Sequence, residues 1–252
     1  MGIRNGLEHD EFTAWFQPEY DLHDGQVIGL EALVRWNRPG TGIVPAGDFI
    51  DIAEEIGAAP TMSELALEQA AALASSWTGR SHQPKIRINI TGAQLHGDHL
   101  ELEVLSTLSR HGLEPQILCL EVTERSLLID VDQATRTLSR IRAHGVEVAV
   151  DDFGTGFSSL AWLKRLPIDT LKIDQSFVQG LATEHADREI VRTVINLADA
   201  LDLDVVAEGV EQPEQVEILR NIGCHRAQGW LWSPAVEANA VPTLINTPIT
   251  MP

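Results

Sequence analysis

The chain has 252 residues, 44% of them hydrophobic, and its 37 acidic residues outnumber 18 basic ones to give a formal net charge of −19. This length is usual for a single α/β barrel, and the hydrophobic content is enough for a full core. The negative charge argues against non-specific binding to nucleic acid or anionic membranes, so we expect no DNA partner.

The first part of the chain predicts a hairpin and two helices. Residues 7–16 form either a short helix or an extended lead-in to a strand that starts at Trp15, and residues 27–36 form the second strand. Asp24 and Gly25 between them are a hairpin signal, so these two strands should be antiparallel neighbours. A short helix over residues 45–56 and a longer, alanine-rich helix over 61–77 follow.

The rest of the chain alternates strands with helices. We predict strands over residues 85–91, 116–123, 147–152, 170–174, 204–208 and 225–230, and helices over 100–111, 131–144, 158–165, 185–201 and 213–222. Such repeats with short apolar strands indicate a parallel sheet covered on both faces. Six units and a hairpin come close to eight strands, so we expect an α/β fold, a TIM-like (β/α)8 barrel with an antiparallel first strand. The alternative is an open doubly wound sheet, against which the first strand lacks a glycine-rich phosphate loop.

The two cysteines, Cys119 and Cys224, are each assigned to a predicted strand, which argues against a disulfide framework and fits a reducing cytoplasm. The chain has no cationic start followed by an apolar segment, and no apolar run near the roughly 20 residues that span a bilayer. We therefore expect a cytoplasmic domain, and the full-length protein could still be membrane-anchored.

The strand predicted over residues 147–152 ends in two adjacent carboxylates, Asp151 and Asp152. A glycine-rich segment follows them. Adjacent carboxylates repel each other, and a divalent cation that prefers oxygen ligands would neutralise them. Taken alone, the stretch could equally be a solvated turn. Other strand ends carry similar side chains, which favours a metal site.

Polar side chains also end the other parallel strands, at the end of a barrel where active sites lie. In chain order these residues are Glu31, Asn89, Glu121, Asp151 with Asp152, Lys172, Glu208 and Gln228. The donors are mostly oxygens, and no two of the nine histidines share ligand spacing on one element. The set therefore suits a pair of Mg²⁺ or Mn²⁺ ions rather than zinc.

Two such ions would activate water near neutral pH and stabilise the attacking and leaving oxygens of a phosphoryl group. Lys172 could orient water or neutralise developing charge, or it could be a structural counter-ion to its neighbours. Arg35 could bind a phosphate through two parallel hydrogen bonds. These residues predict a metal-dependent phosphohydrolase and do not identify its substrate.

The same residues lie in motifs that resemble the EAL domain, a family of bacterial cyclic di-GMP-specific phosphodiesterases. The signature triplet is Glu31-Ala32-Leu33, which Val34-Arg35-Trp36 follows. Further matches, in family order, are Gln17-Pro18, Ile88-Asn89-Ile90-Thr91, Glu121-Val122-Thr123-Glu124, the run from Asp151 to Leu160, Leu171-Lys172-Ile173-Asp174, Ala207-Glu208-Gly209-Val210-Glu211 and Gln228-Gly229. A triplet alone is a weak signal, whereas this ordered set covers nearly the whole chain and is highly specific.

The resemblance implies a single EAL-type barrel domain over residues 1–252, excised from a larger multidomain protein, that hydrolyses cyclic di-GMP to linear pGpG with two metal ions. It implies one metal at Glu31, Asn89, Glu121 and Asp151, and a second held by Asp151 and Asp152. Lys172, Glu208, Glu211 and Gln228 would orient water or support the metals, and Gln17 and Arg35 would contact the substrate. It also implies a homodimer, a linked GGDEF or sensory domain, and a regulatory loop that couples the dimer to the site through Glu124, Phe153, Gly154, Thr155 and Gly156.

The chain departs from the family pattern in three places. Glu19 and Tyr20 stand where an aliphatic residue usually follows Gln-Pro, Trp230 and Trp232 replace Tyr and Phe, and Pro234-Ala235 replaces a Lys-Pro pair. These changes could alter guanine packing or affinity, and they remove no metal ligand. Degenerate relatives act as cyclic di-GMP receptors or protein-interaction modules, which is the alternative to an active enzyme.

Overall fold

The computed structural model describes residues 2–77, 83–155 and 163–251. In that part of the chain the strands are β1 (Phe12–Asp21), β2 (Val27–Arg38), β3 (Gly42–Pro45), β4 (Lys85–Ile90), β5 (Leu118–Thr123), β6 (Glu147–Phe153), β7 (Thr170–Ile173), β8 (Asp204–Ala207), β9 (Arg226–Gln228) and β10 (Val236–Glu237). The helices are α1 (Ile3–Glu8), α2 (Ile50–Glu55), α3 (Ala59–Ser75), α4 (Gly92–Leu95), α5 (Leu100–Arg110), α6 (Glu124–Ile129), α7 (Val131–Ala143), α9 (Gln175–Gln179), α10 (His185–Ala200), α11 (Pro213–Asn221) and α12 (Val241–Asn246), with short 3-10 turns at Ala46–Asp48 and Pro115–Ile117.

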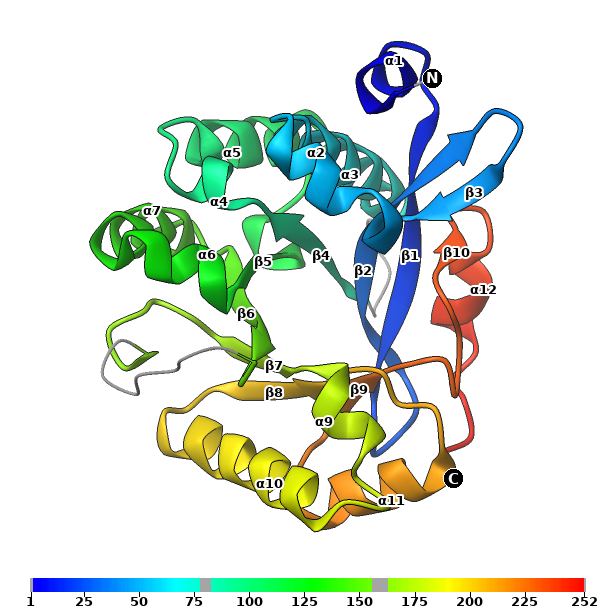
Figure 1. Cartoon of the computed structure of the whole chain (residues 1–252), viewed down its shortest axis with the longest axis vertical. Helices are drawn as coiled ribbons and strands as arrows, with labels where there is room; N and C mark the ends of the chain where they lie inside the picture. The colour runs from blue at the N-terminus through cyan, green and yellow to red at the C-terminus, as the bar shows by residue number, and fades with distance from the viewer. Residues whose placement is uncertain (1, 78–82, 156–162, 252) are drawn as a thin grey trace.

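Eight of these strands close into a barrel (Figure 1). β1 is antiparallel to both β2 and β9. Parallel pairings run from β2 through β4, β5, β6, β7 and β8 to β9. Because β1 joins both ends of the parallel series, the predicted (β/α)8 barrel with an antiparallel first strand is confirmed, and an open doubly wound sheet is excluded.

The parallel strands are buried on both faces, as the unbroken apolar runs in the sequence indicate. In β5, Leu118 to Val122 are all buried, and in β7 all four residues are buried. The helices around the barrel bury one face each. In α10 the buried residues Val191, Val194, Ile195 and Ala198 recur at the three- and four-residue spacing of one helix face.

The helices predicted over residues 100–111, 131–144, 185–201 and 213–222 correspond to α5, α7, α10 and α11. The helix predicted over 61–77 begins earlier, at Ala59, because Pro60 fits the first turn, where its missing N–H costs no hydrogen bond. Most of the helix predicted over 158–165 lies outside the described residues.

Three other boundaries were predicted wrongly. The segment 7–16 contains the end of α1 and the start of β1, since β1 begins at Phe12 rather than at Trp15. The single helix expected over 45–56 is a 3-10 turn followed by α2. Cys224 precedes β9 instead of lying in it. Cys119 and Cys224 are both buried and form no disulfide. The strands β3 and β10, which extend the sheet beside β2 and β1, were not predicted.

No helix within the described residues is long and apolar enough to cross a membrane.

Candidate active site

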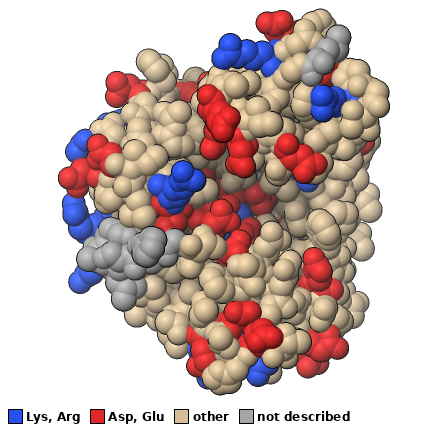
Figure 2. All heavy atoms as spheres, in the orientation of Figure 1, with Lys and Arg blue, Asp and Glu red and all other residues tan. Residues whose placement is uncertain are grey.

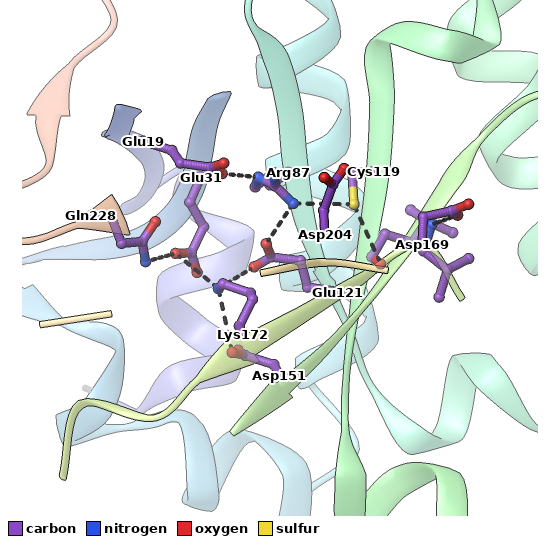
Figure 3. A network of polar contacts seen from close by, with 12 residues as sticks. Glu19, Glu31, Arg87, Cys119, Glu121, Asp151, Asp169, Lys172, Asp204 and Gln228 are labelled. Atoms are coloured by element: carbon purple, nitrogen blue, oxygen red, sulfur yellow. Dashed lines mark hydrogen bonds and ion pairs between the residues drawn. The ribbon is translucent and has the colours of Figure 1, made fainter. Parts of the chain in front are cut away.

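The barrel brings the polar residues at the carboxyl ends of its parallel strands into one cluster (Figure 3). Lys172 of β7 lies at its centre, with its side chain fully buried. Its ammonium nitrogen Nζ lies 2.8 Å from Glu121 Oε2 and 2.8 Å from Glu208 Oε1. The same atom lies 3.3 Å from Asp151 Oδ1 and 3.4 Å from Glu31 Oε2. One cation therefore faces four carboxylates from four other strands or strand ends.

Two side-chain amides fix the orientation of these carboxylates. Asn89 Nδ2 donates a hydrogen bond to Glu31 Oε1 over 2.8 Å. Gln228 Nε2 donates to Glu31 Oε2 over 2.8 Å and to Glu208 Oε1 over 2.7 Å. Each oxygen of Glu31 thus has an amide donor. Oε2 also accepts from Lys172, whereas Oε1 accepts only from Asn89 among the described residues and retains acceptor capacity for a metal ion.

A β-bulge explains how two consecutive aspartates reach the same site. Successive residues of a strand normally point to opposite faces, but the pairing of β6 with β7 shifts register between Val150 and Phe153. Asp152 adopts a φ of 54°, in the left-handed region that aspartate tolerates better than most residues. Its backbone N–H donates to Asp151 Oδ1 over 3.0 Å. The bulge therefore places both carboxylates at the rim.

Two glycines hold the loop after β8 against β9. A Cβ at Gly229 would lie 2.0 Å from the carbonyl oxygen of Val210, so this close approach requires glycine. Val210 donates its N–H to Gln228 O over 3.1 Å, and Gly209 has a φ of 68°. This packing positions Glu208 beside the Gln228 amide.

The cluster carries more negative charge than Lys172 can neutralise, and the pKa values of its carboxyls reflect this. Burial, together with the charges of Glu31 and Asp151, raises the pKa of Glu121 to about 8. Burial, with Asp151 and Asp174, raises the pKa of Asp152 to about 6. Burial and Asp151 also raise the pKa of Glu208 well above its ordinary value.

The pKa values of Glu31 and Lys172 shift in the directions that favour their charged forms. Burial opposes the charged form of Glu31, but Lys172 and the hydrogen bonds from Gln228 and Asn89 outweigh it and lower the pKa of that carboxyl. Burial likewise opposes the charge of Lys172, and the surrounding carboxylates outweigh it and raise its pKa. Both shifts favour the charged forms, so Lys172 faces the carboxylates of the cluster as a cation.

The donor set fits divalent metal ions. Asp151, Asp152 and Glu208 each offer one oxygen, and these atoms all lie within 4.8 Å of one another. The excess of carboxylates over cations must be met by protons or by metal ions, and all-oxygen sites suit Mg²⁺ or Mn²⁺. A hollow near the middle of the face drawn in Figure 2 is lined with Asp and Glu atoms. An anionic substrate would approach it only with bound cations.

The remaining predicted residues lie around this cluster. Gln17 pairs directly with Glu31 in the β1–β2 register, so both side chains lie on one face of the hairpin. Arg35 is partly buried. Burial lowers the pKa of its guanidinium, and the negative charge of Glu31 partly offsets this. Glu211 is exposed in the turn before α11, and its backbone N–H donates to Gln215 Oε1. No ion pair between Glu211 and the Lys172 cluster occurs among the described residues.

The predicted regulatory loop contacts α6. The backbone N–H of Gly154 donates to Glu124 Oε2 over 3.4 Å, and the Glu124 side chain is buried. Thr155 Oγ1 donates to the carbonyl oxygen of Asp152 over 2.9 Å. These contacts connect Glu124 to the backbone beside the Asp151 and Asp152 carboxylates. Gly156, the last predicted member of the loop, lies outside the described residues.

Two charged residues near the site were not predicted. Glu19 and Arg87 form a buried ion pair, and Arg87 Nη1 lies 3.6 Å from Glu121 Oε1. One signal was available: Arg87 precedes Asn89 by two residues in a predicted strand, so both side chains point to the same face.

Comparison with known proteins identifies one family, because the EAL domain matches residues 2–235. The chain is 41% identical to protein Rv1354c of Mycobacterium tuberculosis, over 98% of this chain and 40% of that protein. It is 39% identical to the bifunctional diguanylate cyclase/cyclic di-GMP phosphodiesterase MucR of Pseudomonas aeruginosa, over 91% of this chain and 34% of MucR. The chain thus spans well under half the length of these curated relatives.

Solved structures with a similar fold include proteins of the same family. The structure of the PaMucR phosphodiesterase in complex with c-di-GMP matches with a TM-score of 0.91 and 38% identity, covering 95% of this chain and 97% of that one. The EAL domain of Mycobacterium smegmatis DcpA matches with a TM-score of 0.82 and 36% identity, covering 95% and 99% of the two chains. The likeness in fold extends over nearly the whole of this chain.

Proposed function

The chain belongs to the EAL domain family, and on this premise we propose that it hydrolyses cyclic di-GMP to linear pGpG with the help of two Mg²⁺ or Mn²⁺ ions. The observation that carries the proposal is the full set of oxygen donors around Lys172, with Asp151, Asp152 and Glu208 offering oxygens within 4.8 Å of one another. The names of MucR and of the related cyclic di-GMP phosphodiesterase NbdA of Pseudomonas aeruginosa, 40% identical to this chain, support the substrate.

Bound metals would supply activation of water near neutral pH and neutralisation of charge on the phosphoryl oxygens. In the proposed assignment, Glu31, Asn89, Glu121 and Asp151 would hold one ion, and Asp151 and Asp152 would hold the second. Asn89 would offer its amide oxygen after rotation of an amide that donates to Glu31 in this structure. The proximity of Glu208 to Asp151 and Asp152 makes it a further candidate ligand of the second ion.

The other residues act on water and substrate. Lys172 is a fixed cation 2.8 Å from Glu121 and Glu208, so it is placed to hold a water molecule or to neutralise charge on the reacting phosphate. Gln228 would keep Glu31 and Glu208 oriented through its two hydrogen bonds, and Glu211 would orient water or support the metals. Gln17 and Arg35 would contact the substrate, with Arg35 binding a phosphate.

The test is an assay of the purified chain with cyclic di-GMP and Mg²⁺ or Mn²⁺, in which the products are separated by chromatography. We expect pGpG to appear only when a metal is present. Tight binding of cyclic di-GMP without a linear product would support the alternative, a receptor or interaction module of the same fold. Comparable turnover of unrelated phosphodiesters would contradict cyclic di-GMP as the substrate.

We also propose that the domain forms a homodimer and that the Glu124–Gly154 contact couples the dimer to the metal site. A linked GGDEF or sensory domain in the full-length protein is part of the same proposal, and MucR, which is named as bifunctional, supports it. Sedimentation analysis over a range of concentrations, with activity measured in parallel, tests the dimer. A monomer with full activity at every concentration would contradict a requirement for dimerisation.

A further inference from the structure

The Glu19–Arg87 ion pair is buried inside the barrel beside the metal-binding cluster (Figure 3). Arg87 Nε contacts Glu19 Oε2, and the two side chains are 2% and 0% exposed. Glu19 is on β1 and Arg87 on β4, with β2 between them. Gly29 of β2 provides the space, because a Cβ there would lie 2.9 Å from Glu19 Oε2 and 3.1 Å from Arg87 Nε. Two strands thus carry the charged side chains, and the strand between them carries the glycine that leaves room for them.

The other end of the Arg87 guanidinium reaches the metal-binding cluster. Its Nη1 lies 3.6 Å from Glu121 Oε1 and donates a hydrogen bond to Cys119 Sγ over 3.3 Å. Lys172 contacts the other oxygen, Glu121 Oε2, so the two oxygens of this carboxylate face different cations. The Glu121 side chain is fully buried, and its Oε1 has no hydrogen-bond partner among the described residues. Arg87 is therefore the group that faces this oxygen from within the barrel.

Stability alone does not explain the pair. Removing two charges from water costs free energy that a buried ion pair often fails to recover, and apolar residues of similar volume are frequently as good or better. Barrel interiors are usually filled by branched aliphatic side chains. A role in orienting a neighbouring group accounts for both charges.

We propose that Arg87, held in place by Glu19, keeps Glu121 Oε1 directed away from the metal site, so that Glu121 offers a single oxygen to a metal. This inference rests on the proposed function. A carboxylate that binds through one oxygen suits Mg²⁺, which is small and octahedral, whereas Ca²⁺ takes six to eight oxygens and often uses both oxygens of a carboxylate. Glu19 and Arg87 are thus positioning residues that favour Mg²⁺ over Ca²⁺.

The experiment compares the affinities of Mg²⁺ and Ca²⁺, each added alone and measured by calorimetry, in the wild type and in Glu19→Leu with Arg87→Met. This double variant removes both charges together and leaves neither buried without a partner. We expect the preference for Mg²⁺ over Ca²⁺ to fall about tenfold, the usual scale for loss of a group that orients a metal ligand. An unchanged ratio in a folded double variant would overturn the inference, even if both affinities moved together.

A second variant and a control make the result decisive. In Arg87→Lys, a single ammonium replaces the separate nitrogens that face Glu19 and Glu121, so a smaller shift in the same direction is expected. If the double variant does not fold, this variant decides, and an unchanged ratio in it overturns the inference. The control is Lys85→Met with Glu147→Leu, which removes a partly exposed ion pair between β4 and β6 and should leave the ratio unchanged.

The same titrations separate this inference from the proposed function. A wild type that binds Mg²⁺ selectively but yields no pGpG would contradict the proposed activity and leave the role of the pair standing. A wild type that binds neither ion would overturn both.

Discussion

Gln228 Nε2 donates a hydrogen bond to Glu31 Oε2 over 2.8 Å, which joins β9 to β2 across the antiparallel strand β1. The two residues are 197 positions apart in the sequence. Closure of the barrel alone brings them together, and with the Asn89 contact on the other oxygen it fixes the Glu31 carboxylate in a single orientation.

Glu31 should therefore be essential for hydrolysis and dispensable for folding. Glu31→Ala removes a proposed metal ligand whose position depends on Asn89 and Gln228, and we expect turnover to fall by about a hundredfold or more. Turnover of cyclic di-GMP at limiting and saturating Mg²⁺, with circular dichroism of the fold, measures this. The matched control is Glu214→Ala, an exposed residue of α11. Normal turnover of a folded Glu31→Ala protein at limiting metal would remove Glu31 from the ligand set.

Metal binding should release protons. Asp152, with a pKa of about 6, and Glu121, with a pKa of about 8, carry protons over part of the neutral range. Both must be ionised to bind a metal, so the apparent affinity for Mg²⁺ should rise as the pH rises from 6 to 8. Calorimetry in two buffers of different ionisation enthalpy counts the released protons. A constant affinity and no buffer dependence would argue against these carboxyls as ligands.

Much of this site could be predicted because it depends on local patterns. The carboxyl ends of parallel strands meet at one rim, so residues such as Asn89, Glu121 and Lys172 could be grouped without knowing any contact. What the sequence could not supply was the pairing of distant strands. The Glu19–Arg87 pair depends on β1 and β4 flanking Gly29, and nothing local to either residue indicates its partner.

The position of Asp152 shows a second limit. Strict alternation along β6 would send Asp151 and Asp152 to opposite faces, and only the bulge between Val150 and Phe153 brings both to the rim. Such a bulge is set by the register of the neighbouring strand, which the sequence of β6 alone does not specify. The metal assignment of Asp152 therefore came from its adjacency to Asp151 at the strand end and from the family resemblance, and not from the alternation of the strand.

A pH effect on stability is expected far from the site, at Glu103 of α5. Burial, reinforced by the charge of Glu64, raises its pKa to about 7. A carboxyl whose pKa is higher in the folded state than in the unfolded state stabilises the fold while it is protonated, at low pH. This stabilisation is lost as the pH rises from the pKa of the unfolded state to the folded-state pKa of about 7. Glu103→Gln should therefore raise the melting temperature at pH 8 by about 2–4 °C and have little effect at pH 4.5. Thermal denaturation at both pH values measures this.

The neighbouring Glu101 provides a control of opposite sign. Hydrogen bonds from His144 and Arg140 lower its pKa in the folded state. The charged Glu101 carboxylate therefore stabilises the fold at pH values above the pKa of the unfolded state. Glu101→Gln should then lower the melting temperature at pH 8. A fall in melting temperature for Glu103→Gln as well would mean that the Glu103 carboxylate is stabilising and that its burial matters less than its contacts.

Lys172 has two possible roles, and the structure makes both physically reasonable. With four carboxylates within 3.4 Å of its ammonium, it could simply offset their repulsion. It could instead act on the attacking water or on the phosphoryl charge, which is an effect on the transition state. Two bound metals would already neutralise most of the carboxylate charge, so we expect the second role. Its loss should lower kcat by about a hundredfold or more.

Titration of Mg²⁺ against the turnover and melting temperature of Lys172→Ala separates these roles. If Lys172 acts on the transition state, saturating Mg²⁺ restores the melting temperature of the variant, because metal charge replaces ammonium charge, while kcat stays low. Lys172→Arg then keeps the positive charge but moves the donors, so it should fold normally and remain slow. If saturating Mg²⁺ returns kcat of the alanine variant to near the wild-type value, Lys172 is only a counter-charge and the transition-state role is wrong.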